Sequence, residues 1–319
     1  MKNKLFLLLG VSLLALNACT KDPIITEPDL TPVEKPSKPT PPTTDPTDPG
    51  TTDPVKPGDF SNIPEAQKAY YAGVDFTKKG TALKADLTDK ITKTHTKKLK
   101  YTPEVWEAIK ATDYVPVTSG DPTLVYLVYG HKNKGNSTDK EAYTREISKQ
   151  NKGGAGFDTW NREHVYTQDA GGFDTKIPGA ATDVHNLRSA DVDWNGKRGN
   201  LKFAPGNGYS GPITGGWYPG DEWKGDVARM MMYMYVRYGE QCLPSKIGVG
   251  STTSTPDGMI DLFLKWNAED PVSDIEKRRN DYHGNTAKPY AQGNRNPFID
   301  NPYLATQIWG GPEAENRWK

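Results

Sequence analysis

Cysteine is nearly absent from this chain of 319 residues, which contains only Cys19 and Cys242. Two cysteines cannot form a disulfide framework, a cysteine-rich zinc site or the ligand set of an iron–sulfur cluster. Cys242 follows a helical pattern, where a cysteine is expected to be a small buried apolar residue rather than a nucleophile.

The chain also lacks net charge and long apolar segments. Its 40 basic and 40 acidic side chains balance, so the basic surface from which nucleic-acid binding is usually argued is missing. Such binding is not excluded, because a bound metal ion can supply positive charge locally. Hydrophobic residues make up only 34% of the chain, which excludes a polytopic membrane protein.

The first twenty residues have the pattern of an export signal. Two lysines precede an apolar run from Leu5 to Leu16, which is too short to cross a bilayer comfortably. The following Leu16-Asn17-Ala18-Cys19 resembles the lipobox of bacterial lipoproteins, and Thr20 favours the outer membrane by the same resemblance. Residues 1–18 are therefore predicted to be a lipoprotein signal peptide and Cys19 the lipidated N-terminus. An ordinary signal peptide is the alternative.

A proline- and threonine-rich segment separates that signal from the rest of the chain. Residues 20–58 hold eleven prolines and nine threonines, and proline fixes φ and removes backbone donors. Residues 19–58 are therefore predicted to be the lipidated cysteine and an extended tether. Residues 59–319 contain no second break of this kind and no repeat, and are predicted to form one domain.

Helical patterns dominate this domain, with a few short strands, so the expected class is α+β. Apolar residues recur at every fourth position across Leu83–Ile91, and Asp221–Tyr238 is the clearest predicted helix, with its methionines facing the core. Leu124–Tyr129 is an apolar, β-prone run and is predicted to be a buried strand. The stretches 152–180 and 196–220 are rich in Gly, Asn and Pro and are expected to be long loops.

The five histidines differ in their surroundings. His95 lies in a lysine-rich helical stretch and is expected to be solvated, His131 ends a strand, and His283 lies in a predicted polar loop. His164 and His185 instead lie in segments that also contain carboxylates, arginines and amides. These two histidines are therefore the candidates for chemistry.

The segments around His164 and His185 hold the parts of a metal-dependent hydrolase. Asp183 and His185 are two residues apart, so they would share one face of a strand, and further oxygen ligands lie in residues 191–200. Such oxygens suit a hard divalent cation, a neutral histidine can take a proton from water, and arginine matches phosphate. The pattern predicts metal-assisted phosphodiester hydrolysis, with a structural calcium site as the alternative.

Six blocks of the chain form an ordered set of motifs. They are WNREHV at 160–165, TDVHNLR at 182–188, NGKRGN at 195–200, KGDVARMMMYMYVRYG at 224–239, DPVS at 270–273 and QGNRNPFIDNP at 292–302. In this order they resemble the endonuclease I family of secreted and periplasmic nucleases. Any one block is weak evidence, whereas the resemblance covers nearly all of residues 60–310 and the set is specific.

The resemblance implies a His-Me finger, or ββα-metal, core embedded in a largely helical single domain with long loops. It implies that His164 is the general base that activates water, and that Glu163 and Asn195 bind one divalent cation. Mg²⁺ is the first choice, with Ca²⁺ or Mn²⁺ as alternatives. Asp183 and His185 are expected to orient the finger from behind these ligands rather than to bind the ion.

The arginine that supports catalysis has two candidates, Arg162 and Arg198, because both lie in matching blocks. The short loop at 166–181 holds only Lys176 as a basic group, so it supplies no arginine. A groove that tracks the substrate's phosphates is expected from basic side chains elsewhere in the domain. They are Lys197, Arg198, Lys202, Arg278, Arg279 and Arg295.

Together these features predict a non-specific, metal-dependent endonuclease that is an outer-membrane lipoprotein, on the cell surface or the periplasmic face. Its cation would stabilise the phosphate and the leaving O3′ of extracellular DNA, RNA or both. No assigned residue reads the sugar, so the sequence does not rank DNA over RNA. The implied partners are nucleic acid and, through the lipid alone, the membrane; no protein partner is implied. The alternative is a catalytically inactive surface lipoprotein that binds nucleic acid or another extracellular partner.

Overall fold

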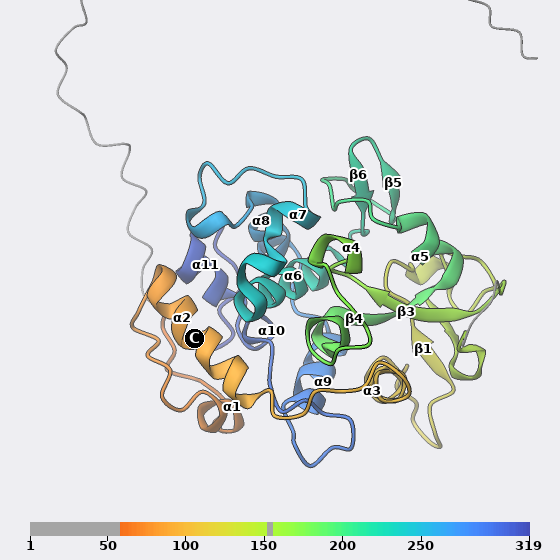
Figure 1. Ribbon diagram of the computed structural model, residues 1–319, viewed down its shortest axis with the longest axis horizontal. Helices are drawn as coiled ribbons and strands as arrows, with labels where there is room; N and C mark the ends of the chain where they lie inside the picture. The colour runs from red at the N-terminus through yellow and green to blue at the C-terminus, as the bar shows by residue number, and fades with distance from the viewer. Residues whose placement is uncertain (1–57, 152–155) are drawn as a thin grey trace, which may run out of the picture. The chain divides into compact units, whose positions relative to one another are not determined.

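The computed structural model describes residues 58–151 and 156–319, which combine many helices with three small antiparallel sheets (Figure 1). The expected α+β class is therefore confirmed. The predicted signal peptide, Cys19 and nearly all of the predicted tether lie outside the described residues. Within the described ranges, no helix is both long enough and apolar enough to cross a membrane.

The helices of the described residues differ widely in length, and two of them reach fifteen residues. In chain order they are α1 Glu65–Tyr70, α2 Gly80–Thr94, α3 Glu104–Thr112, α4 Gln168–Gly171, α5 Val192–Arg198, α6 Lys224–Tyr238, α7 Pro244–Ile247, α8 Asp261–Glu269, α9 Asp274–His283, α10 Pro297–Asp300 and α11 Tyr303–Trp309.

The strands pair as three hairpin-like ribbons, each antiparallel. The first joins β1 Leu124–Tyr126 to β2 Thr144–Glu146, the second β3 Trp160–His164 to β4 Leu187–Asp191, and the third β5 Gly211–Ile213 to β6 Gly216–Tyr218. Two 3₁₀ helices, η3 Ala180–Thr182 and η4 Val184–Asn186, lead into β4.

Helix α6 is the centre of the helical part, where it contacts α2, α8 and α10 (Figure 1). Met230, Met231, Met232 and Met234 are all buried in it, which confirms that these methionines face the core. Because α6 is covered on all sides, its apolar residues are not confined to one stripe. Gly239 ends the helix with φ 55°, as the sequence predicts.

The strand and loop predictions are only partly correct. The apolar run Leu124–Tyr129 pairs as a strand only to Tyr126, because Gly130 N–H bonds to the carbonyl of Leu127 and the chain turns there. The stretch 152–180 contains β3, and 196–220 contains the β5–β6 hairpin. These elements are short, and their partners are distant or follow a glycine-rich turn, so composition alone predicts loops.

A buried carboxylate, that of Asp113 at the end of α3, joins three parts of the fold. It accepts a bond from Arg279 on α9, and its Oδ2 lies 3.2 Å from the Nε of Arg188 on β4. Its Oδ2 also accepts the backbone N–H and the hydroxyl of Ser189, each at 3.0 Å. Burial raises the pKa of Asp113, but Arg279 and Arg188 hold it below its usual value. This ion pair therefore fixes β4 between two helices.

Replacing Asp113 by Asn should lower the free energy of unfolding by about 3–5 kcal/mol, because it leaves buried arginine charge without its partner. Urea unfolding followed by circular dichroism measures this change. Asp89→Asn is the control, since Asp89 is exposed and pairs with Lys93 on the surface of α2, and it should change stability by less than about 0.5 kcal/mol. Equal losses in the two variants would contradict the role given to Asp113.

Candidate active site

The segment with the predicted chemistry folds as two antiparallel strands followed by a helix. His164 of β3 pairs with Leu187 of β4, and α5 begins directly after β4. Asp191 makes this connection sharp, because its side chain caps the helix by accepting the N–H of Trp194 at 2.9 Å. Helix α5 therefore lies against the ribbon (Figure 1).

Helix α5 contacts one face of β3 through two pairs of side chains. Asn195 donates its amide N–H to the Oδ1 of Asn161 at 2.8 Å. One turn later, Arg198 Nε lies 3.7 Å from the Oε1 of Glu163. The bond to Asn161 uses the amide nitrogen of Asn195, so its oxygen remains free to bind a cation.

Glu163 is 3% exposed, and one of its two carboxylate oxygens accepts a hydrogen bond. Tyr129 donates its hydroxyl to Oε1 at 2.9 Å, and Oε2 has no hydrogen-bond partner among the described residues. Burial raises the pKa of Glu163 to about 7, against the opposing effects of Arg198 and of the Tyr129 hydrogen bond. A cation bound at Oε2 would favour the ionised form that burial disfavours.

The His164 ring is held by a single strong contact. Its Nε2 lies 2.7 Å from the carbonyl oxygen of Ala181. Because a carbonyl oxygen can only accept, Nε2 carries the proton and the lone pair is at Nδ1, which has no partner among the described residues. Burial, with a smaller effect from Arg162, lowers the pKa of His164 to about 4 even though the Ala181 bond opposes it. The imidazole is therefore neutral at pH 7.

Glu163 and His164 point to opposite faces of the ribbon, as strand alternation predicts. Glu163 lies with Tyr129 and α5, whereas the ring of His164 stacks on Tyr101 with centroids 5.6 Å apart. Among the described strands β3 pairs only with β4, apart from an isolated bridge between Trp160 and Gln150. Its other edge, here called the outer edge, therefore has no strand partner at His164.

Arg162 lies on the same face as His164. Its guanidinium stacks between the rings of Tyr101 and Trp106, 3.4 Å and 4.2 Å from their centroids. It donates to the backbone carbonyl of Tyr101 and to the hydroxyl of Thr102. The side chain lines a cavity of about 240 Å³ beside α3, so it is fixed in orientation yet open to a ligand.

Arg198 has a different position, because it is fully buried. It donates to the backbone carbonyls of Val165 at 2.9 Å and Gly199 at 3.0 Å, and its guanidinium lies over the ring of Phe203. Its Nε, the atom nearest Glu163, has no hydrogen bond. The charge of Arg198 thus acts on Glu163 from inside the fold.

The prediction that Asp183 and His185 share one face of a strand is wrong, because they lie at the 3₁₀ helix η4. The Asp183 side chain caps that helix by accepting the N–H of His185 at 2.9 Å. Its other oxygen accepts the hydroxyls of Tyr233 at 2.7 Å and Tyr238 at 2.8 Å, both from α6. Asp183 therefore anchors the segment that carries the Ala181 carbonyl.

Two histidines lie beside this carboxylate, and a third packs against one of them. His185 bonds through Nε2 to the carbonyl of Asn294 at 3.1 Å. His95, expected to be solvated, is buried with its Nδ1 3.8 Å from Asp183 Oδ2. His283, expected in a polar loop, ends α9 and is fully buried against His185, and its ring nitrogens have no partner among the described residues. Packing of distant helices, which local composition cannot reveal, buries both.

The predicted phosphate-tracking groove is also wrong for most of its members. Arg279 is buried against Asp113, and Arg295 pairs with Asp300 at 2.6 Å. Arg278 donates to backbone carbonyls at the end of α3, and Lys202 donates to the carbonyl of Ser245. Arg279 and Arg295 are thus buried within the fold and Arg278 is half-buried, whereas Lys202 stays exposed.

Several residues of the site had no signal in the sequence analysis. Tyr129 holds Glu163 although its backbone has φ 71°, Tyr101 stacks on His164, and Asn161 orients Asn195. Ala181 contributes only its carbonyl, which any residue type would supply. Asn161 lies within a matching block and could have been chosen; the other contacts arise from tertiary packing.

The histidines around Asp183 should make the fold sensitive to acid. Burial lowers the pKa of His185 to about 4 and that of His283 well below its usual value, and neighbouring His185, Arg279 and His95 lower the latter further. Between about pH 6.5 and 4 the unfolded chain then binds more protons than the folded one, so the free energy of unfolding decreases as the pH is lowered. His283→Leu should remove about 1.4 kcal/mol per pH unit from that slope. Urea titrations from pH 7 to 4.5 measure it, and parallel slopes for wild type and variant would contradict it.

Comparison with known proteins is consistent with this geometry. A family model described as Endonuclease I matches residues 79–303. The chain is similar to an extracellular ribonuclease of Bacillus amyloliquefaciens, with 40% identity over 259 residues, 77% of this chain and 80% of the relative. It is also 40% identical over 255 residues to an extracellular ribonuclease of Bacillus subtilis (strain 168), 75% of this chain and 78% of the relative. The chain belongs to the endonuclease I family, a family of nucleases.

Proposed function

We propose that this protein is an exported, metal-dependent endonuclease that hydrolyses RNA, and DNA as well, with little sequence preference. The observation that carries the proposal is the neutral His164, whose Nε2 is fixed by Ala181 and whose Nδ1 has no partner among the described residues. Two relatives are named ribonucleases, which favours RNA. Recognition through phosphate alone would let the same site act on DNA.

The β3–β4–α5 unit is proposed to be the His-Me finger of the family. Its first strand carries His164, its helix carries Asn195, and the Asp183 anchor holds the connecting segment in place. A phosphate at the outer edge of β3 would meet groups from both faces of the strand. This arrangement separates the base from the cation ligands and still lets both act on one phosphate.

His164 is proposed to be the general base. Its Nδ1 lone pair accepts a proton from water as the water oxygen forms a bond to phosphorus, and the P–O3′ bond breaks. The Ala181 carbonyl stabilises the imidazolium that results, because it already accepts the N–H at Nε2. The leaving O3′ takes up a proton and departs as a hydroxyl.

Glu163 Oε2 and Asn195 Oδ1 are proposed to hold one divalent cation. Both oxygens lack a hydrogen-bond partner among the described residues, and both belong to the β3–α5 interface. When bound, the cation would neutralise charge on the phosphate and on the leaving O3′. Oxygen ligands favour Mg²⁺, with Ca²⁺ or Mn²⁺ as alternatives. No three His, Cys, Asp or Glu side chains converge within the described ranges, so waters would complete the ligand shell.

Arg162 is the better candidate for phosphate contact, because it borders a cavity on the His164 face. Arg198 is better suited to hold the Glu163 carboxylate in its ionised form from within the core. Asp183 and His185 are proposed to position Ala181 rather than to bind the ion. Each assignment follows from the groups that the polar end of the side chain contacts.

The place of action is proposed to be outside the cytoplasm. The relatives are called extracellular, and the signal-like residues 1–18 agree with export. Lipid attachment at Cys19, a tether over 19–58 and outer-membrane residence stay proposals from the sequence. A catalytically inactive lipoprotein that binds nucleic acid is the alternative; it would retain binding and lack cleavage.

Replacing His164 by Ala should lower the rate of RNA cleavage by about 10²–10⁴-fold, because the base is lost. Its free energy of unfolding should remain close to that of the wild type, which urea titration checks. Added imidazole should restore part of the rate in a concentration-dependent way, because a free base can replace the missing one. Loss of folding, or full activity without the imidazole, would show that His164 is not the base.

Replacing Asn195 by Ala should raise the Mg²⁺ concentration for half-maximal cleavage by at least about tenfold. Asn195→Asp, which retains an oxygen ligand, should need less Mg²⁺ than the alanine variant. Asp193→Ala is the control, because Asp193 lies on the exposed side of the same helix. If Asp193→Ala shifts the Mg²⁺ dependence as much as Asn195→Ala does, or if EDTA leaves the wild-type rate unchanged, the metal site is misassigned.

A further inference from the structure

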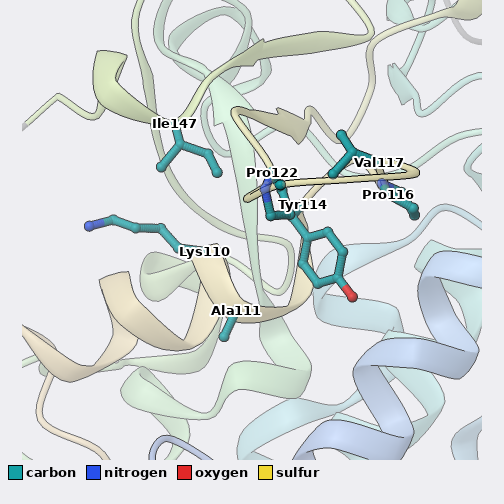
Figure 2. Close-up of a pocket in the computed structure, with 8 residues that line it drawn as sticks. Lys110, Ala111, Tyr114, Pro116, Val117, Pro122 and Ile147 are labelled. Carbon is teal, nitrogen blue, oxygen red and sulfur yellow. The ribbon is translucent and has the colours of Figure 1, made fainter.

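Two cavities lie side by side along α3, and Lys110 lines both. The smaller is the one of about 240 Å³ that Arg162 borders. The larger, about 490 Å³, is bounded by Lys110 and Ile147 on one side and Pro116 and Val117 on the other (Figure 2). The larger cavity has no role in the chemistry derived above.

Lys110 links the two cavities, because it lines both. Arg162, which lines the smaller cavity, lies on the same face of β3 as His164. Both side chains also contact the ring of Tyr101. A strand of nucleic acid that extends from His164 past Arg162 can therefore continue along α3.

The larger cavity combines apolar side chains with one cation, Lys110, which pairs with Glu107. Pro116, Pro122 and Val117 form walls, and Val117 is 47% exposed, so nothing among the described residues covers it. Tyr114 lies in the centre of the lining (Figure 2). Arg278 fixes Tyr114, because its guanidinium stacks 4.5 Å from the ring centroid and donates to the Tyr114 carbonyl at 2.8 Å. The cavity is thus preformed.

We propose that this cavity binds a nucleobase of a single-stranded part of the substrate, at a position beyond the cleaved phosphate. The proposal rests on the proposed function. Apolar and aromatic surfaces stack with any base without reading its edge, and Lys110 and Arg162 supply charge for the phosphates between the cavity and His164. A base in a duplex is already stacked and paired, so it would have to be extracted first. The cavity therefore selects single strands over duplexes.

Two substitutions of Val117 test the cavity, because this side chain is exposed and its replacement does not disturb the core. Val117→Asp and Val117→Lys both place a charged group on the apolar wall, with opposite effects on phosphates. Val249→Asp is the matched control, since Val249 is 42% exposed in the loop after α7. Lys110→Ala removes the positive charge of the cavity, and Lys277→Ala is its control, because both lysines pair with a carboxylate three residues earlier.

The measurements are binding and cleavage by the full chain of one unstructured 20-nucleotide RNA, alone and annealed to its complement. Binding is followed by fluorescence anisotropy in EDTA, and cleavage is followed in Mg²⁺. Both Val117 variants should weaken single-strand binding about fivefold or more, with little change for the duplex and for cleavage of a dinucleotide. Lys110→Ala should weaken binding of both forms, because it removes phosphate contact.

The outcomes separate this proposal from the proposed function. If the wild type binds single strands preferentially and the Val117 variants lose that preference, the cavity is a base site even if no cleavage occurs. If the Val117 variants change binding in opposite directions, or no more than Val249→Asp does, the base site is overturned while cleavage by the wild type still stands. Equal binding of single strands and duplexes by the wild type also overturns it.

Discussion

The hydrogen bond between His164 Nε2 and the carbonyl of Ala181 is the constraint on which the rest of the site depends, because it decides which ring nitrogen is free. A backbone carbonyl can do this only if its segment cannot move. Asp183 provides that restraint two residues later, where it accepts hydrogen bonds from the hydroxyls of Tyr233 and Tyr238 on α6 and from the N–H of His185 on η4. Beyond it, Asp113 holds β4 in place through the N–H of Ser189. Buried carboxylates in the core thus fix the tautomer of His164.

The site also separates its charges in a way that suits an anionic substrate. Glu163 is the one carboxylate proposed to bind the cation, and Arg198 and Tyr129 stabilise it from the protein side. The other proposed ligand, Asn195, is neutral. His164 has no carboxylate partner among the described residues, and Glu107, which lines the cavity beside Arg162, is paired with Lys110.

The helices and the catalytic segment could be predicted from the sequence, because their signals are local. Apolar spacing identified the buried side of α2 and the methionines of α6, and the ordered motifs led to the strand–strand–helix unit. Predictions failed where the deciding partner is distant. The prediction that Arg279 lines a groove failed because its partner, Asp113, lies 166 residues earlier in the chain, and no local pattern indicates that the two pair. The prediction of a loop at His283 failed because the burial of this residue depends on packing between helices. The prediction of a strand at Asp183 failed because the 3₁₀ helix there has three residues, too few to show a periodic pattern in the sequence.

The most direct test of the central claim, that His164 activates a water which displaces O3′, is end-group analysis of a defined RNA cleaved in H₂¹⁸O with Mg²⁺. The account predicts fragments with a 3′-hydroxyl and a 5′-phosphate, and mass spectrometry should find one ¹⁸O in each new phosphate. It also predicts the same ends from DNA, because no 2′-hydroxyl takes part. Fragments ending in a 2′,3′-cyclic phosphate, with no ¹⁸O incorporated in the cleavage step, would contradict the account, because they would show that the sugar rather than water attacks phosphorus.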